Sequence, residues 1–266
     1  MPAQPADLAR QLFDRLVRVA DQGVQGIPDE LEMRRLERDA KALLKTDPGK
    51  AHQLLGGIAA IRWDIDGMHS HHLAALKHAG KASTYRNYAT SLQLVGLFQE
   101  AAKYLEIACE RQPENLAYLR TASTFALWAG SPHKALELEL QLQKRDPDHS
   151  LADRPVAIIK KLLALMERQG ISEADLQAAM GLTFDFLRNR KERFTHVSLT
   201  PDEDQDAAFF TIHVDLPAKE VVTADAELGR RFAEQMPELS SALVVQLEPQ
   251  EQISTRVNDG QAARPS

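Results

Sequence analysis

Four of the chain's nine histidines lie in one short stretch, residues 67–80, and imidazole is a common zinc ligand. His69 and His72 are three residues apart and share one face of a helix, whereas His71 and His78 are seven apart and share another. A zinc site needs three or four ligands that converge on one point. Because this spacing divides the histidines between two faces, we expect a partly packed, partly solvated helix and no metal ligands.

A second cluster of reactive side chains lies between residues 196 and 215. Paired carboxylates can hold Mg²⁺ or act as acid and base, but the run PDEDQD falls where a hairpin turn is expected, and turns favour such residues for local reasons. His213 and Asp215 share one face of a predicted strand and form the best-placed pair. No GxSxG, Walker, GxGxxG or HExxH motif is present. We therefore expect no catalytic residue and no cofactor, and keep a hydrolase- or nuclease-like site as an alternative. The cluster comprises His196, Asp202, Glu203, Asp204, Asp206, His213 and Asp215.

The composition, with 44% hydrophobic and 26% charged residues, is typical of a globular protein. A net charge of −6 argues against coating nucleic acid through bulk electrostatics. The single cysteine, Cys109, excludes an intramolecular disulfide and a CxxC zinc site. No run approaches the roughly 18 apolar residues of a membrane-spanning helix, and the first residues lack the order of a signal peptide. We expect a cytoplasmic protein with no membrane partner.

The central part of the chain repeats with a period of 34 residues. Three pairs of residues are separated by that number: Gly96 and Gly130, Ala101 and Ala135, and Pro113 and Pro147. This period, with small residues at fixed positions and a closing proline, is the signature of the tetratricopeptide repeat (TPR) family, which the sequence resembles most clearly over residues 82–148. The resemblance implies paired helices, in which Ala89 and Ser123 take the small position of the first helix. Leu142 stands where the family prefers alanine, so looser packing is expected there.

Two repeats are too few to bury their faces, because about three units are needed for stability. Degenerate copies flank them, over residues 48–81, before residue 48 and after Pro147. Beyond residue 193, alternating segments predict a hairpin, followed by a helix and a strand. We therefore predict a mainly α protein. Its expected parts are a tetratricopeptide-like α-solenoid over residues 1–191, a small α/β unit (β-hairpin, helix, strand) over 192–248 and a disordered tail over 249–266.

Arginines recur at one phase of the repeat. In the resembled family, the fifth and ninth positions of each first helix commonly face the concave groove, and Arg86 and Arg120 match the fifth. Arginine presents a planar fork of donors suited to carboxylates. We therefore predict that the groove binds an acidic or extended segment of a partner protein; the alternative is that each arginine pairs with a neighbouring glutamate. The predicted partner-binding residues are Arg86, Asn87, Thr90, Gln93, Arg120, Thr121, Thr124, Trp128 and Arg154, with Tyr85 as a further candidate apolar anchor.

Residues 171–193 are loosely similar to a DNA-binding helix-turn-helix. In that interpretation Gly181 lies in the turn, and a basic end would meet phosphate. Gln177 and Arg190 do not fit, since the motif usually has alanine and an apolar residue there. A last helix with a basic end, favoured by the helix dipole, is the simpler interpretation. The residues that fit the motif are Leu176, Met180, Gly181, Leu182 and Leu187, and the basic ones are Arg188, Arg190, Lys191 and Arg193.

Together these observations predict a non-catalytic protein–protein interaction module, an adaptor whose partner is another protein and not a nucleic acid. The alternatives are a DNA-binding regulator that uses residues 171–193 and a hydrolase-like site in the C-terminal α/β unit. That unit could also bind a second partner, cap the solenoid or mediate a homodimer through an exposed edge strand.

Overall fold

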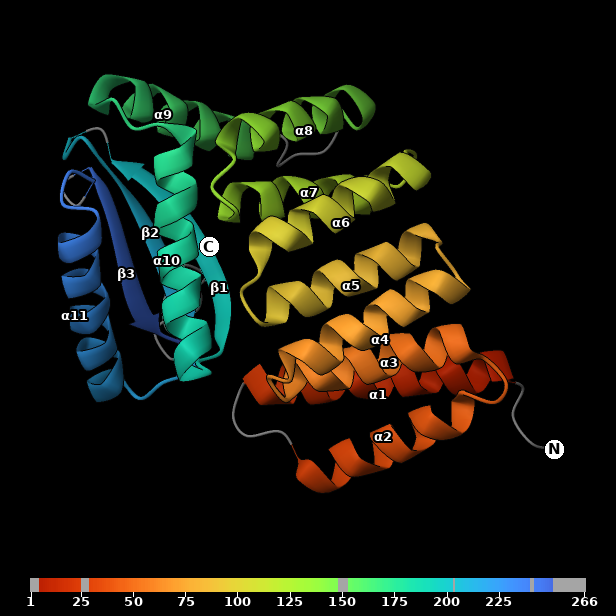
Figure 1. Ribbon diagram of the computed structural model, residues 1–266. Helices are drawn as coiled ribbons and strands as arrows, with labels where there is room; N and C mark the ends of the chain where they lie inside the picture. The colour runs from red at the N-terminus through yellow and green to blue at the C-terminus, as the bar shows by residue number, and fades with distance from the viewer. Residues whose placement is uncertain (1–4, 25–28, 148–152, 203, 240–241, 251–266) are drawn as a thin grey trace, which may run out of the picture. The chain divides into compact units, whose positions relative to one another are not determined.

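The computed structural model describes residues 5–24, 29–147, 153–202, 204–239 and 242–250 (Figure 1). It divides into two compact units, Met1–Val156 and Ala157–Ser266, and each is described by itself. The sequence places the boundary after residue 191 instead. The difference arises because α10 (Glu173–Arg190) contacts α11 (Ala218–Gln235), which in turn packs on a strand of the sheet. Most of the predicted tail, residues 251–266, lies outside the described residues.

The first unit is a stack of helices in which consecutive helices pair (Figure 1). Three hairpins, α3/α4, α5/α6 and α7/α8, contact one another through α3 with α5, α4 with α5, and α6 with α7. This is the predicted tetratricopeptide-like α-solenoid. Its helices are α1 (Pro5–Val24), α2 (Glu30–Leu43), α3 (Pro48–Ile61), α4 (Ile65–His78), α5 (Ala82–Leu94), α6 (Phe98–Arg111), α7 (Leu116–Trp128) and α8 (Pro132–Arg145).

The small residues of the repeat lie where the two helices of a hairpin meet. Ala89 of α5 and Ala101 of α6 are both fully buried. In the next hairpin, the Ser123 hydroxyl of α7 donates to the Ala135 carbonyl of α8 at 3.3 Å. A larger side chain at these positions would hold the two helices apart, so the small residues set the close approach within each pair.

Short polar residues and left-handed turns fix where the helices begin and end. Asp47 and Asp64 cap α3 and α4 by accepting from backbone N–H groups of their first turns at 3.0 and 2.9 Å. Gly96 and Gly130 adopt φ values of 73° and 81° in the turns inside their hairpins. The turn between α3 and α4 has Trp63 at φ 59° instead, so the first hairpin makes the same turn without glycine.

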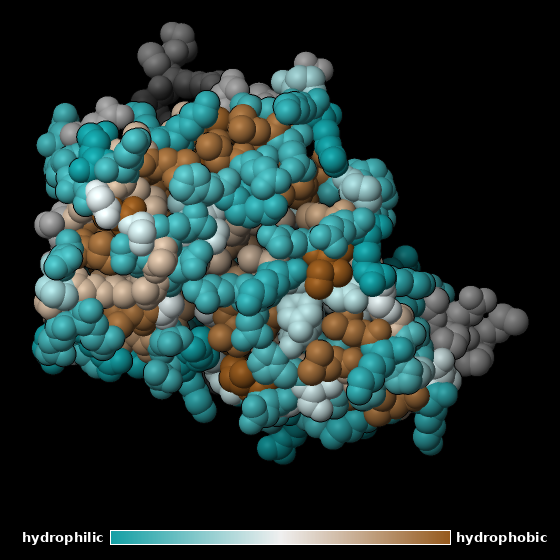
Figure 2. Space-filling view, turned by 45° about the horizontal axis from the view of Figure 1, so that its top comes forward, coloured by the Kyte–Doolittle hydropathy of each residue, from teal (hydrophilic) through white to brown (hydrophobic). Residues whose placement is uncertain are grey.

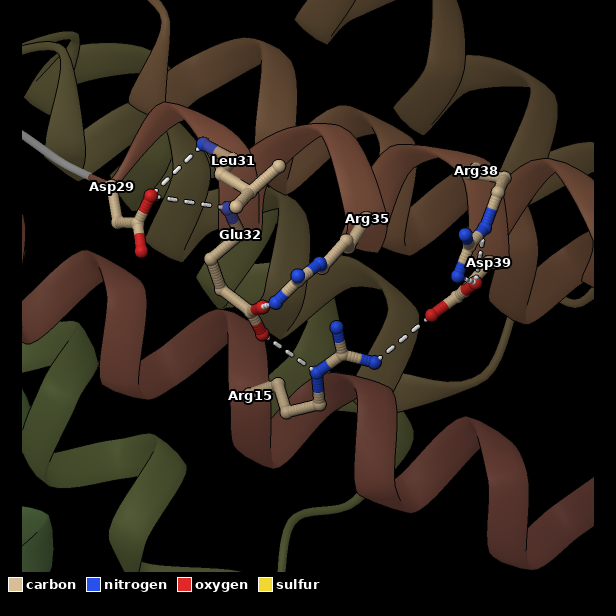
Figure 3. Close-up of polar contacts among 7 residues, drawn as sticks. All are labelled: Arg15, Asp29, Leu31, Glu32, Arg35, Arg38 and Asp39. Atoms are coloured by element: carbon tan, nitrogen blue, oxygen red, sulfur yellow. Dashed lines mark hydrogen bonds and ion pairs between the residues drawn. The ribbon is translucent and has the colours of Figure 1, made fainter.

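The N-terminal helix is fixed by apolar burial and by one arginine. Leu12 and Leu16 of α1 belong to the buried core shared with α2 and α3. Arg15 lies beside that core: its Nε donates to Glu32 at 2.8 Å and its Nη1 to Asp39 at 3.0 Å (Figure 3). Burial raises the pKa of Asp39, but hydrogen bonds from Arg38 and Arg15 outweigh it, so the pKa lies below its usual value.

Replacing Arg15 with methionine should lower the free energy of unfolding by about 1–2 kcal/mol, because Glu32 and Asp39 lose charged hydrogen bonds while the apolar stem is kept. Urea unfolding followed by circular dichroism measures the change. Arg10→Met is the control, since Arg10 is exposed and its ion pair with Asp7, at 4.0 Å, is long and solvated. Equal stability of the two variants would show that Arg15 does not hold α1.

The second unit consists of helices and a three-stranded sheet. Its elements are α9 (Asp153–Gln169), which begins just before the unit, α10, β1 (Phe194–Asp202), β2 (Ala207–Val214), α11 and β3 (Leu243–Pro249). β1 and β2 form an antiparallel hairpin, and α11 connects β2 to the parallel strand β3. This order confirms the predicted hairpin, helix and strand. One sheet face is apolar and includes Phe210, Ile212 and Val214, all fully buried.

Both outer edges of the sheet carry proline. In β3, the Gln250 N–H donates to the Val214 carbonyl of β2, so the backbone N–H and C=O groups of even-numbered residues point toward β2. The backbone groups of odd-numbered residues, including Pro249, therefore point outward. By the same alternation Pro201 of β1 faces away from β2. On the β3 edge, the outward N–H of Leu247 donates to the Asp225 carboxylate of α11 at 2.7 Å.

Candidate functional site

A polar row connects the first helices of consecutive hairpins. Gln53, Asn87 and Thr121 are spaced by 34 residues and therefore occupy the same phase of α3, α5 and α7. The Asn87 side-chain amide donates to the side-chain oxygen Oε1 of Gln53 at 2.8 Å, which joins α3 to α5. Gln53 was missed in the sequence analysis, although subtracting one period from Asn87 identifies it.

The predicted arginines lie beside this row. Arg86 is exposed, and its hydrogen bond is to the Asn87 side chain at 3.4 Å. Within the described part of the chain no carboxylate pairs with Arg86. Arg120 is 3.9 Å from Asp146, with 48% of its side chain exposed, a long and solvated pair. Arg154 falls in α9, and its side chain lies outside the described residues.

The predicted threonines bond to their own helices. Thr90 and Thr124 donate to the carbonyls of Arg86 and Arg120 at 3.1 and 3.2 Å, and Thr121 donates to its own helix in the same way. Their hydroxyl hydrogens are therefore used, while their oxygens can still accept. Gln93 is half-buried near the end of α5.

The predicted aromatic anchors both pack within the first unit. The Trp128 ring meets Phe98 edge-on at 5.2 Å and stacks with Phe125 at 6.2 Å, and the side chain is half-buried. Tyr85 stacks with Tyr104 at 6.4 Å. Both rings therefore stabilise the hairpins and offer a partner only part of their surface.

The histidines of α4 divide between two neighbours, as their spacing predicts. His69 and His72 face α5, where His69 bonds to the Tyr88 hydroxyl and His72 to Ser91 at 2.8 Å. His71 faces α3, with its Nδ1 3.1 Å from that of His52. Among the described residues, no three histidine, cysteine or acidic side chains are placed to hold a metal ion.

His72 is buried to an extent that the sequence analysis did not predict. It is 1% exposed, and its ring stacks on Tyr88 at 4.7 Å and lies against Gly56 of α3. Burial lowers its pKa to about 3, helped by the charges of His71 and His69, so the imidazole is neutral at physiological pH. The repeat does indicate this burial, because the position of His72 in α4 corresponds to Leu105 in α6, 33 residues later, and Leu105 is fully buried.

The helix-turn-helix interpretation of residues 171–193 is wrong. Gly181 lies inside one continuous helix, α10, where no turn separates two helices. Two of the basic side chains are paired within the unit: Arg188 with Asp185, and Arg190 with Glu227 at 3.0 Å. The hydrophobic spacing of a single buried helix also satisfies the apolar positions of that motif.

The reactive cluster of the second unit does not converge. Asp202 accepts backbone bonds within the hairpin turn, and Asp206 pairs with Arg168 at 2.8 Å. His213 lies 3.8 Å from Glu248 of β3, while burial raises the pKa of Asp215 and the charge of Arg193 lowers it. His196 is exposed opposite His213, Asp204 lies in the turn, and Glu203 lies outside the described residues.

Among the described residues, the exposed large hydrophobic side chains are spread over several helices. They are Val17 of α1, Leu31 of α2, Leu73 of α4, Leu140 of α8 and Val222 of α11. Figure 2 shows, on one face, hydrophobic residues interspersed with hydrophilic ones. Of the described helices, none has both the length and the hydropathy needed to cross a bilayer.

No family model and no curated protein matches the chain. A solved structure from the functional characterization of Pseudomonas aeruginosa PilF aligns over 88% of this chain and 94% of its own, with a TM-score of 0.45 and 14% identity. A mutant O-GlcNAc transferase from Thermobaculum terrenum aligns over 55% of this chain and 28% of its own, with a TM-score of 0.40 and 19% identity. Neither likeness is close enough to carry an argument. The helical hairpins themselves define an α-helical repeat protein with an added α/β unit.

Proposed function

We propose that the chain is a non-catalytic adaptor that binds an acidic or extended segment of a partner protein along the first helices of its hairpins. One observation carries the proposal: Arg86 is exposed, has no carboxylate partner among the described residues and shares its phase with Arg120. An arginine that is not committed to an intramolecular ion pair is available to a carboxylate ligand.

The polar row gives this surface a second means of recognition. Asn87 is held by Gln53, so its position is fixed before a ligand arrives and little side-chain entropy is lost on binding. The oxygens of Thr90 and Thr124 can accept N–H groups of an extended segment. We propose that the arginines bind carboxylates while Asn87, Thr90 and Thr124 bind the segment's backbone.

Reversing both charges, with Arg86→Glu and Arg120→Glu together, should reduce recovery of bound partners at least tenfold in affinity capture from native lysate, quantified by mass spectrometry. Close like charges cost an acidic ligand several kcal/mol. Lys77→Glu with Lys103→Glu is the matched control, since both lysines are exposed on second helices of hairpins and the two changes together alter the net charge by the same amount. Partners retained by the double variant, with its helicity intact, would contradict the proposal.

A further inference from the structure

Three tyrosines fill the space at one side of the α5/α6 hairpin. The Tyr104 ring lies 4.2 Å from Tyr88 and 6.4 Å from Tyr85. Arg111 closes this cluster: its guanidinium lies over the Tyr85 ring at 4.9 Å, and its Nη1 donates to the Gly80 carbonyl at 2.7 Å. The hairpin therefore contains an aromatic cluster with a cation placed over one ring.

The next hairpin has the same arginine without the aromatic rings. Thirty-four residues after the tyrosines stand Leu119, Ala122 and Leu138. Arg145, 34 residues after Arg111, donates to the Pro113 carbonyl as Arg111 does to Gly80. Its guanidinium is thus tied to the corresponding backbone position, but the residues at the tyrosine positions of this repeat are aliphatic.

A cavity of about 250 Å³ lies at this place, between α6, α7 and α8. Leu119, Ala122 and Leu138, all nearly buried, line it together with the half-buried Cys109. Burial raises the pKa of the Cys109 thiol to about 11, so the thiol is uncharged at neutral pH. Its three buried aliphatic lining residues thus stand at the repeat positions that the tyrosines occupy 34 residues earlier.

We propose that this cavity binds an aromatic ring, supplied by a tyrosine side chain of a partner polypeptide. The protein fills the corresponding space of the preceding hairpin with tyrosine, and Arg145 is held where a cation meets a ring face. The apolar side chains of the cavity can pack against the faces of a ring, while its polar lining, which includes Lys134, Gln141 and Arg145, can contact a polar ring substituent. Glu106 and Glu110, for which the described residues provide no ion pair, line the cavity and can accept a phenolic O–H.

The first test uses p-cresol, the side-chain analogue of tyrosine, in an NMR titration of the full chain that follows the methyl groups of Leu119, Ala122 and Leu138. We expect saturable shifts that Ala122→Tyr abolishes, because the new ring occupies the cavity. Arg145→Ala should weaken p-cresol binding about two- to fivefold through loss of the cation–π contact. This second variant still tests the proposal if Ala122→Tyr does not fold. No saturable shift, or equal binding of cyclohexanol, would overturn the proposal.

The second test distinguishes a tyrosine side chain from a free aromatic ligand. An acetylated and amidated Gly-Tyr-Gly peptide should displace p-cresol, and the corresponding Gly-Ala-Gly peptide should not. Binding of p-cresol without displacement by the tyrosine peptide would overturn the assignment to a polypeptide side chain. Arg86→Glu with Arg120→Glu should leave p-cresol binding unchanged, so this proposal and the proposed function fail separately.

Discussion

Acidification from pH 7 to pH 4 should cost the wild-type protein about 3 kcal/mol more stability than it costs a variant with His72→Leu and Ser91→Ala. His72 is 1% exposed, and its Nδ1 has no hydrogen-bond partner in the described structure. Burial, with the nearby His71 and His69 charges, lowers its pKa from 6.5 to about 3. In the folded state His72 therefore stays neutral at pH values at which a histidine of the unfolded chain is already protonated.

The direction follows from which state binds the proton. Between pH 6.5 and pH 3 the unfolded chain is protonated at His72 and the folded chain is not, so protonation favours unfolding. Stability is therefore unaffected by this group above pH 6.5 and falls by about 1.4 kcal/mol per pH unit below it. Other groups titrate in this range, and the comparison of the two proteins removes their share.

Urea unfolding of both proteins at pH 7, 6, 5 and 4 measures the difference. Leucine is the natural replacement because Leu105 is buried at the corresponding position of the next hairpin, and Ser91→Ala removes the hydroxyl that His72 would leave without its partner. Parallel pH curves for the two proteins would mean that His72 titrates normally in the folded state.

Gly56→Ala should destabilise the protein by about 2 kcal/mol, although alanine is the better helix former. A Cβ at this position of α3 would lie 2.5 Å from Cδ2 and 2.6 Å from Nε2 of His72. The ring cannot move away, because it is stacked on Tyr88 at 4.7 Å and bonded to Ser91. The added methyl group must therefore push α3 and α4 apart.

Gly229→Ala in α11 is the matched control, because nothing lies within 4 Å of the added Cβ there. This substitution should stabilise the protein by about 0.5–1 kcal/mol through helix propensity alone. In a His72→Ala background, Gly56→Ala should lose most of its destabilising effect. Chemical denaturation of the wild type, the two single variants and the double variant measures this coupling. A cost that persists without the imidazole would contradict the contact.

The repeat made much of the first unit predictable. Glycine, alanine and proline at fixed spacing identified the hairpins and the close contacts of Ala89 with α6, since only small residues and turns satisfy those positions. The alternation of apolar residues likewise identified β1 and β2. The 34-residue spacing of Arg86 and Arg120 located both on first helices, and their role toward a partner stays a prediction.

Features that depend on contacts between elements were not predictable in the same way. The burial of His72 depends on Gly56 of another helix, so the spacing within α4 does not reveal it, and only comparison with Leu105 of the next hairpin indicates it. Residues 171–193 match a helix-turn-helix locally, yet Gly181 continues the helix because α10 packs along its length within the second unit. The proximity of His213 to Glu248 needs the parallel strand β3, 35 residues away.

The prolines at the sheet edges have a consequence for how chains behave in concentrated solution. A strand can recruit another chain only through outward N–H and C=O groups, and amyloid growth begins in the same way. Pro249 and Pro201 each remove one such donor, and the Asp225 carboxylate occupies the donor of Leu247 while placing a negative charge at the β3 edge. At the β3 edge, Pro249 and Leu247 therefore offer no free N–H group to a strand of another chain, so fewer donors are left there for fibrillar growth or strand exchange.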